Sequence, residues 1–559
     1  MNLILTVFIL LLLVALSGVT VRFFPLVPLP LLQLIIGTLA ASLPGIGLRV
    51  DFNPEFFLLL FVSPLLFAES WRVSKREFFR LSSPILTLAL GLVIFTVIGA
   101  GYLVHWAIPI IPLSAAFALA AVLSPTDTVA VSEVARRIKM PPRLMHVLEG
   151  ESLLNDASGL VAMKFAIAAT LTGSFSLLEA MRSFFVIAIG GLFLGFAVAW
   201  LFSWVQDKLI ALRGEELSLQ LVLLRLLLPF STFALAERFA VSAILAVVAA
   251  GVTVDFTDRR RSGALASRMQ MRQLRTMIEF VFNGLIFLLL GLQLPQFIGG
   301  PVRAAYQSTG PGEACRLLGL TAALWLALLA LRFVWIWGAL RVSARWAKQP
   351  GPSDASSPRY IGAAALAGIR GSVTLAGVLS VPLALPDGSP FPARDLLIFL
   401  ASGVIVLSLF GGCFGLPIVL RSLVLPPGDL QEREKHEART SAAAAAVRAL
   451  EKVQQPADDS DPALYLEVLG HVTAHYRLQI DAARDPETDP VQAARAASFE
   501  RELWLTGLRA ERAELYRLRS VSRIDDDTLR SLVDEIDLIE ASIRAAGTAP
   551  QPSSFKLPG

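Results

Sequence analysis

The sequence has little charge, few histidines and almost no cysteine. Only 17% of its 559 residues are charged and 55% are hydrophobic, whereas about a quarter of a soluble domain is charged. The two cysteines, Cys315 and Cys413, form no CxxC motif, which excludes a disulfide scaffold, an iron–sulfur cluster and a cysteine-ligated zinc site. Five histidines leave little for another metal site. We therefore expect no cofactor and, from a mean hydropathy of +0.64, a membrane protein.

Long apolar segments fill the sequence instead. A helix crosses a bilayer with about 20 apolar residues, and thirteen runs of that size lie between Leu3 and Leu420. The first run has no basic residue before it and is followed by Arg22, the reverse of a cleavable signal peptide, so we expect it to be retained. The predicted fold is an all-α membrane protein with 13 transmembrane helices in residues 1–425.

The charges predict an orientation and a second region. With the N-terminus outside, inward loops hold 21 Lys and Arg residues and outward loops hold six, which predicts a cytoplasmic C-terminus. Residues 1–428 carry 32 basic against 21 acidic residues, but residues 429–559 carry 17 against 24. Leucines and isoleucines recur at helical spacing between Leu503 and Ile539. We predict a cytoplasmic helical tail over residues 426–559 that packs on itself or on a second copy of the chain.

Two of the apolar runs contain residues that interrupt helices. The run 112–135 holds Pro125 and Asp127, and the run 359–383 holds Arg370 between two glycines. Proline removes a backbone donor, and a charge at membrane depth needs a partner or a pathway. These runs are the fifth and the twelfth, which predicts inverted six-helix repeats whose broken helices meet at an ion site.

The sixth run opens with the sequence EGESLLND, which places several polar groups deep in one helix. Ser152 and Asp156 share a face four residues apart, and Glu151 and Asn155 share the adjoining face. Asp156 lies two turns deeper than Glu149, whose position is typical of a group that caps a helix end. Oxygen ligands of this kind suit hard cations, and burial favours the protonated form of a carboxylate. A cation and a proton can therefore compete for Asp156.

These motifs together resemble one family. The ordered set is Ser124 to Asp127 (SPTD), Glu149 to Asp156 (EGESLLND), Gly368 to Gly371 (GIRG) and Glu279 to Leu294. It resembles sodium/proton exchangers of the NhaP and NHE type, in the bacterial form with a hydrophilic tail. The resemblance covers essentially the whole chain. It implies a homodimer in the inner membrane of a bacterium, with a dimerisation domain and an ion-carrying core that moves as an elevator.

The resemblance also implies roles for individual residues. Asp156 is the carboxylate that binds either the cation or the proton, and Asn155 is its neighbour in the Asn-Asp pair. Ser152 and the Thr126 carbonyl contribute oxygen ligands, and Asp127 lies beside them. The remaining implied feature is a structural ion pair between Glu151 and Arg370, which ties the sixth helix to the twelfth.

One acid departs from the family pattern, and three charged residues have no role in it. In many relatives the third-helix acid follows directly on the stretch that corresponds to Pro64 to Phe67, whereas here Ala68 intervenes before Glu69. One residue is about 100° of helix rotation, so the place of Glu69 among the ligands depends on the geometry of that helix. Lys164, Arg332 and Glu279 receive no assignment beyond structural pairing or a place at a helix end.

The expected function is exchange of Na+ for H+ in a one-to-one, electroneutral cycle that serves pH and sodium homeostasis, with K+ or Li+ as alternative cations. The partners expected are membrane lipid, monovalent cations and protons, without nucleic acid. A cation channel is a rival reading, although channels usually repeat a pore filter by oligomer symmetry. An intramembrane protease could use Asp127 and Asp156 as a dyad, but no GxGD motif surrounds either residue. We therefore expect a transporter and not an enzyme.

Overall fold

The chain forms two compact units, Met1–Leu425 and Pro426–Gly559, which are described separately. The computed structural model describes most of the first unit and part of the second. The described residues of the first unit are 3–24, 27–42, 54–73, 75–137, 140–172, 177–213, 218–259, 265–346, 357–385 and 388–421. Those of the second unit are 441, 444–448, 450, 470, 473–474, 490–520, 532–533, 535–541 and 543.

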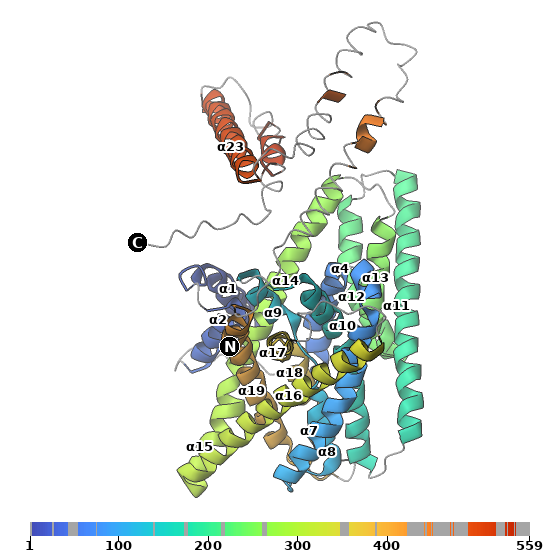
Figure 1. The fold of residues 1–559 in the computed structure, drawn as a ribbon, viewed down its shortest axis with the longest axis vertical. Helices are drawn as coiled ribbons and strands as arrows, with labels where there is room; N and C mark the ends of the chain where they lie inside the picture. The colour runs from blue at the N-terminus through green and yellow to red at the C-terminus, as the bar shows by residue number, and fades with distance from the viewer. Residues whose placement is uncertain are drawn as a thin grey trace. The chain divides into compact units, whose positions relative to one another are not determined.

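The described part of the first unit is helical, apart from one isolated bridge between Ala384 and Pro390 (Figure 1). Six of its helical segments are long and apolar enough to cross a membrane, and five shorter apolar helices accompany them. The helices are α1 (Leu3–Thr20), α2 (Leu29–Ser42), α3 (Pro54–Phe57), α4 (Ser63–Arg72), α5 (Lys75–Arg80), α6 (Ser82–Leu86), α7 (Val93–Ala107), α8 (Leu113–Val122), α9 (Thr128–Arg137), α10 (Pro142–Thr172), α11 (Leu177–Arg213), α12 (Ser218–Arg238), α13 (Ala243–Arg259), α14 (Leu265–Leu294), α15 (Gly300–Thr309), α16 (Pro311–Trp346), α17 (Pro358–Leu366), α18 (Ser372–Leu379), α19 (Arg394–Phe410) and α20 (Leu416–Arg421). The number of membrane crossings and their division into inverted repeats stay predictions.

Both helix interruptions lie where the sequence predicts them. The helix that begins as α8 ends at Val122, and α9 begins at Thr128, so the segment around Pro125 is unwound. In the same way α17 ends at Leu366 and α18 begins at Ser372, which leaves Arg370 in an unwound segment between two half-helices. Each interruption exposes backbone groups that a continuous helix would have satisfied internally.

Four single π-helical turns are embedded in the helices of the described region. They are η1 (Leu58–Val62), η2 (Thr87–Leu92), η4 (Pro295–Gly299) and η6 (Gly411–Gly415). A π-helical turn bonds residue i to residue i+5, so it holds one residue more than an α-helical turn. The helix beyond it is rotated by about 100°. In η2 the exposed carbonyls receive side-chain donors, since Trp335 Nε1 donates to Thr87 O and Ser158 Oγ donates to Ala89 O.

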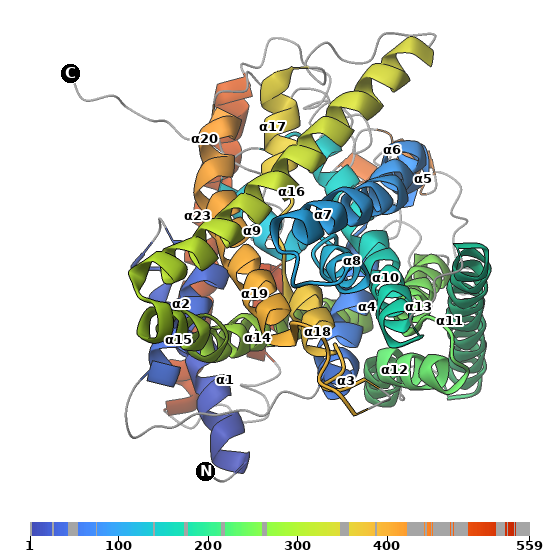
Figure 2. The same cartoon turned by 90° about the horizontal axis from the view of Figure 1, so that it is seen from below.

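Small residues allow the tightest helix crossings of this unit. Gly37 of α2 and Gly291 of α14 face each other, and a Cβ at Gly37 would lie 3.1 Å from the Gly291 Cα. The view in Figure 2 shows α2 beside α14 on one side of the unit, and α11 beside α12 and α13 on the other. Within a bilayer, close packing between helices supplies the attraction that apolar burial supplies in water. The packing of α2 on α14 and of α11 on α13 therefore fixes helices that flank the centre of the unit.

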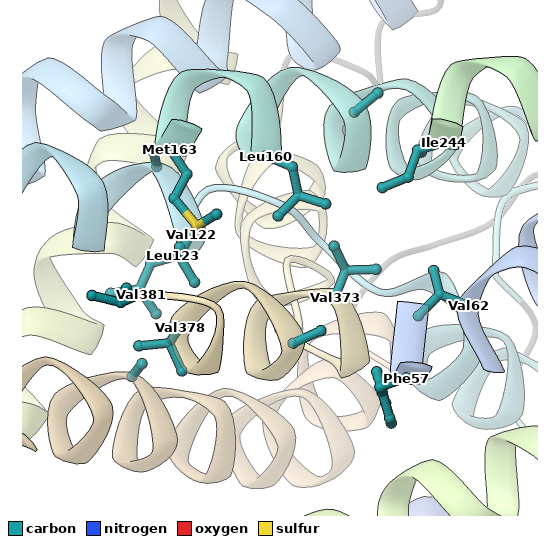
Figure 3. Packing of buried hydrophobic residues seen from close by; sticks show 14 of the residues in the cluster. Phe57, Val62, Val122, Leu123, Leu160, Met163, Ile244, Val373, Val378 and Val381 are labelled. Atoms are coloured by element: carbon teal, nitrogen blue, oxygen red, sulfur yellow. The ribbon is translucent and has the colours of Figure 1, made fainter. Parts of the chain in front are cut away.

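The core of the unit packs around the end of the half-helix α8 (Figure 3). Val122 of α8 and the following Leu123 contribute side chains, and so do Leu160 and Met163 of α10. The valines of α18 and Val62 of η1 close the same cluster. Gly159 of α10 lies against Pro125, because a Cβ there would come within 2.7 Å of the proline ring. The unwound segment is thus held between packed helices.

The described part of the second unit centres on α23 (Pro490–Ser520). Leu508 and Ile536 are buried in this unit, as expected from the apolar spacing in the sequence. Arg512 donates hydrogen bonds to Asp537 and, at 2.6 Å, to Glu540, and these bonds link α23 to the segment 535–541. The hydrogen bond to Glu540 raises the pKa of the Arg512 guanidinium. Helix α23 is therefore held to the segment 535–541 by the partly exposed ion pairs of Arg512, beside the buried side chains of Leu508 and Ile536.

Candidate functional site

The two unwound segments cross at the centre of the membrane unit. The backbone N–H of Asp127 donates to the carbonyl of Ile369 at 2.7 Å, so one interruption satisfies a backbone group of the other. A Cβ at Gly371 would collide with the Asp127 carboxylate, which explains a glycine at this position. Ser408 Oγ accepts the backbone N–H of Arg370 at 2.9 Å. The crossing therefore depends on local sequence at both breaks.

Arg370 neutralises the carboxyl end of half-helix α8. Its side chain is 4% exposed, and its Nη1 donates to the carbonyls of Ser124 and, at 2.9 Å, of Pro125. These carbonyls lost their helical donors where Pro125 interrupts the helix. A cation at the negative end of a helix dipole is favourable, and more so away from water.

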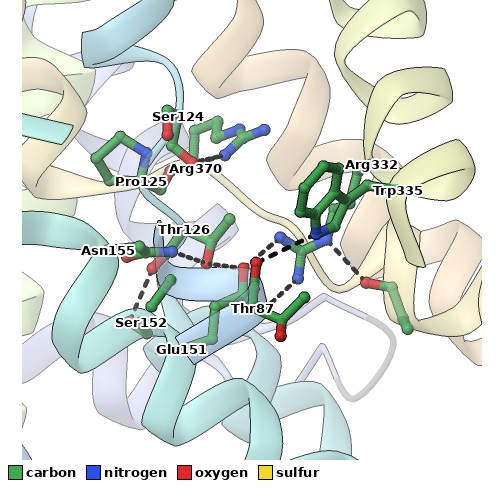
Figure 4. A network of polar contacts seen from close by, with 12 residues as sticks. Thr87, Ser124, Pro125, Thr126, Glu151, Ser152, Asn155, Arg332, Trp335 and Arg370 are labelled. Atoms are coloured by element: carbon green, nitrogen blue, oxygen red, sulfur yellow. Dashed lines mark hydrogen bonds and ion pairs between the residues drawn. The ribbon is translucent and has the colours of Figure 1, made fainter. Parts of the chain in front are cut away.

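Glu151 pairs with Arg332 and not with Arg370, so the ion pair predicted from the sequence is wrong. Arg332 of α16 makes two hydrogen bonds to the Glu151 carboxylate, 2.5 Å from Nη1 to Oε1 and 2.7 Å from Nη2 to Oε2 (Figure 4). Its Nε donates to the carbonyl of Ala364 at 3.0 Å. Arg370 Nη1 instead donates to the carbonyls of Ser124 and Pro125, and Arg332 packs against Gly368, where a Cβ would lie 2.8 Å from Cδ.

Thr126 joins the unwound segment to α10, the sixth predicted helix, which carries Glu151 of this ion pair. Its carbonyl accepts Ser152 Oγ at 2.8 Å, and its hydroxyl accepts Asn155 Nδ2 at 2.9 Å. The same hydroxyl donates to Glu151 Oε1 at 3.4 Å. These three hydrogen bonds hold the unwound segment against α10. They also give Asn155 a positioning role, because its amide nitrogen holds Thr126.

A small cavity lies directly beside this network. Its water-accessible volume is about 30 Å³, so a cation bound in it must shed most of its hydration shell. Carboxylates of Asp156, Asp127 and Glu69 line it, together with the side chains of Ser152 and Thr126. The other lining residues are Val62, Leu65, Leu66, Pro125, Val129, Asn283, Gly371, Val373 and Thr374.

The carboxylates in the cavity have different surroundings. Asp156 is 6% exposed and forms no hydrogen bond or ion pair with any residue that the structure describes. Asp127 accepts the backbone N–H of Val129 at 2.7 Å and so caps the first turn of α9. Asp156 has no such hydrogen bond within the described chain.

Comparison with known proteins agrees with this geometry. Residues 8–422 match the family described as "Sodium/hydrogen exchanger, transmembrane". The chain belongs to the sodium/hydrogen exchanger family. It is 43% identical to the uncharacterized Na(+)/H(+) exchanger YjcE of Escherichia coli (strain K12), over 97% of this chain and 99% of that one. It is 38% identical to the sodium, potassium, lithium and rubidium/H(+) antiporter of Bacillus pumilus (strain SAFR-032), over 97% of this chain and 78% of that one.

The fold is also shared with a solved antiporter. The sodium proton antiporter MjNhaP1 from Methanocaldococcus jannaschii superimposes with a TM-score of 0.54 at 18% identity, covering 76% of this chain and 99% of that one. The predicted family is therefore confirmed, and it is a family of transporters. Like its relatives, the exchanger is a multi-pass membrane protein.

Two residues that line the exchanger's cavity were not firmly assigned to it from the sequence. Glu69 lines the cavity although it is offset by one residue, and the π-helical turn η1 directly before α4 adds a residue and a rotation of about 100°. Asn283 of α14 also lines the cavity. The signal for it was present, because a polar amide interrupts the apolar stretch 280–292 as clearly as a charge would.

The three charged residues without an assignment have separate explanations. Arg332 is the partner of Glu151. Glu279 lies 3.8 Å from Arg275 one turn earlier on α14, which is a pairing at the end of a predicted span. Nothing in the structure explains Lys164.

Proposed function

We propose that this exchanger moves a monovalent cation, foremost Na+, against H+ by competition at Asp156. The observation that carries the proposal is the position of this carboxylate at the crossing, in the cavity, without a hydrogen-bond or ion-pair partner in the described chain. A bare charge there would cost several kcal/mol, so the carboxylate holds either a proton or a cation. Loss of one permits binding of the other, and this is antiport.

The cation's other ligands would be the oxygens nearest to Asp156. Ser152 keeps two lone pairs free after it donates to Thr126, and the Thr126 carbonyl has a second lone pair. Asp127 contributes a carboxylate from the N-terminus of α9, and Glu69 contributes one from α4. Hard monovalent cations prefer such oxygen sets. Asp156 is then the carboxylate that discharges in each cycle, which gives one proton out for one cation in and no net charge moved.

Alternating access would come from motion of one wall of the cavity against the other. Asp156, Asp127 and the valines of α18 belong to helices that meet at the crossing, whereas Glu69 belongs to α4, which packs against α13. We propose that the first group is the ion-carrying core of an elevator and that the second belongs to a dimerisation domain. The exchanger would work as a homodimer in the bacterial inner membrane, with its N-terminus outside and its tail in the cytoplasm.

A broader cation range is the second candidate. The Bacillus pumilus relative is named an antiporter of sodium, potassium, lithium and rubidium, and its 38% identity extends over 97% of this chain. The ligand set offers carboxylate, hydroxyl and carbonyl oxygens, all of which also bind K+ and Li+. Whichever cation is carried, its exchange for protons would serve cytoplasmic pH and ion homeostasis.

Proteoliposomes with an imposed pH gradient test this function. We expect saturable proton flux on addition of Na+, measured in turn against Li+, K+ and Rb+, and the same rate when potassium and valinomycin clamp the voltage. Each unbalanced charge would couple about 2.3 kcal/mol per 100 mV to turnover. A rate that follows the imposed potential would contradict one-for-one exchange, and cation flux without counter-flux of protons would indicate a channel.

A further inference from the structure

Asn283 is a polar side chain in the cavity that has no assigned role. It lies on α14 in the apolar stretch 280–292, at a depth where helices carry polar groups only with a partner or a purpose. It lines the cavity with Asp156 and Glu69. Among the residues that the structure describes, its amide has no hydrogen-bond partner. The side chain is partly buried and no group of the described chain satisfies its amide, so its place in an apolar helix points to a ligand in the cavity.

The helix that presents Asn283 is fixed in place. Gly284, the next residue, packs against α1 and α2, where a Cβ would lie 2.6 Å from Val14 Cγ1 and 2.9 Å from Gln33 Nε2. Two turns further along, Gly291 crosses Gly37 of α2 at close range. A side chain on a rigid element can hold a ligand oxygen at a defined position. Asn283 is therefore presented to the cavity from a wall that does not contain the α9–α10 network.

The chemistry of an amide suits one task in this cavity. Its carbonyl oxygen is a hard, neutral ligand of the kind that completes cation sites built from carboxylates. Because an amide does not titrate, it adds an oxygen without adding a proton to the cycle. A carboxylate in place of this amide would bind the cation more strongly but could also take up a proton.

We propose that the Asn283 amide oxygen is a direct ligand of the transported cation, supplied from α14 on the wall opposite Asp156. This rests on the proposed function of the cavity. The ligand raises cation affinity while it leaves the number of protons exchanged per cycle unchanged. A carboxylate at this position would change cation affinity and the number of exchangeable protons together, whereas the amide changes cation affinity alone.

The test compares three variants in proteoliposomes, with Na+ and Rb+ as probes. Asn283→Leu keeps the side-chain size and removes both polar atoms, and we expect KM for the cation to rise at least tenfold while maximal rate stays within threefold. Asn283→Asp keeps a ligand oxygen, so KM should return to within threefold of the parent at alkaline pH and rise again at acidic pH, where the new carboxyl is protonated. Gln293→Leu is the matched control, because Gln293 is a second amide of α14, is buried, has a side-chain oxygen without a described partner and lies outside the cavity.

Binding without turnover gives an independent readout. Na+ should raise the Tm of the parent and of Gln293→Leu at the same concentrations, and Asn283→Leu should need at least tenfold more. Parent-like KM and parent-like stabilisation by Na+ in Asn283→Leu would overturn the proposal. The proposed function fails in a different way, namely when the parent shows no exchange or when Asp156→Asn retains it.

Discussion

The two units of the exchanger use the same kind of ion pair in opposite surroundings. In the membrane unit, Arg332 and Glu151 have side chains that are 2% and 1% exposed, and they pair through two hydrogen bonds. In the tail, Arg517 and Glu514 also pair through two hydrogen bonds, but are 59% and 52% exposed. The comparison shows that hydrogen-bond geometry alone does not determine how much an ion pair contributes to the free energy of unfolding. Water and salt screen the tail pair, whereas the two desolvated charges of the buried pair are compensated by each other and by hydrogen bonds with the Ala364 carbonyl and the Thr126 hydroxyl.

The largest effect is expected from removing half of the buried pair. Arg332→Ala leaves the Glu151 carboxylate uncompensated and frees the Ala364 carbonyl, so stability should fall by about 3–5 kcal/mol. The measurement is the yield and Tm of folded protein in detergent. Glu151→Gln combined with Arg332→Met removes both charges and should recover much of the loss. A single variant Arg332→Ala with the parent Tm would contradict the assigned pair.

A smaller effect is expected at the crossing of the unwound segments. Gly371→Ala places a Cβ against the Asp127 carboxylate, and overpacking of this kind costs about 1–3 kcal/mol. Because Asp127 lines the cavity, exchange should also slow, with KM for the cation raised. Gly362→Ala is the control, since a Cβ there meets nothing within 4 Å. Equal behaviour of the two variants would show that the crossing tolerates the extra atom.

The smallest effect is expected in the tail. Arg512→Ala removes exposed bonds to Asp537 and Glu540, so Tm should change slightly at low ionic strength and not at all in 1 M choline chloride. Choline is used because Na+ is the expected substrate. The defect of Arg332→Ala should persist in the same salt. If salt instead rescued Arg332→Ala, the pair would be accessible to water and the contrast between the units would be lost.

The tail pairs also predict a pH dependence. Hydrogen bonds from Arg517 hold the pKa of Glu514 below its ordinary value. A carboxyl with a depressed folded-state pKa stabilises the fold above its unfolded-state pKa, and this contribution is lost as pH falls through the folded-state pKa. Arg517→Ala should therefore return the Glu514 titration to its ordinary range, measured by carboxyl carbon NMR. An unchanged titration would show that the pair does not form in solution.

Much of the membrane unit could be predicted from the sequence because its signals are local. Pro125 and the glycines around Arg370 favour an interruption through their own backbone chemistry, and the structure unwinds both segments. The pairing of Glu151 could not be predicted in this way. Arg332 and Arg370 both lie within apolar runs of the sequence, and the choice between them depends on which helix lies beside α10 and on the carbonyls that already accept hydrogen bonds from Arg370.

The cavity shows the same division between local and tertiary information. Ser152, Asp156 and Asp127 were accessible from spacing and charge, and the structure brings them together. The contribution of Glu69 required knowledge of the π-helical turn η1, which has no sequence signature in Leu58–Val62. Asn283 carried a signal that a search for charges alone passes over.

The central claim is that a proton and a cation compete for Asp156. The most direct measurement is Na+-driven proton flux in proteoliposomes that hold either the parent protein or Asp156→Asn, with equal incorporation and equal Tm established first. The account predicts saturable flux in the parent and none in Asp156→Asn, because an amide cannot trade a proton for a cation. Coupled Na+/H+ exchange by the folded Asp156→Asn protein would contradict it.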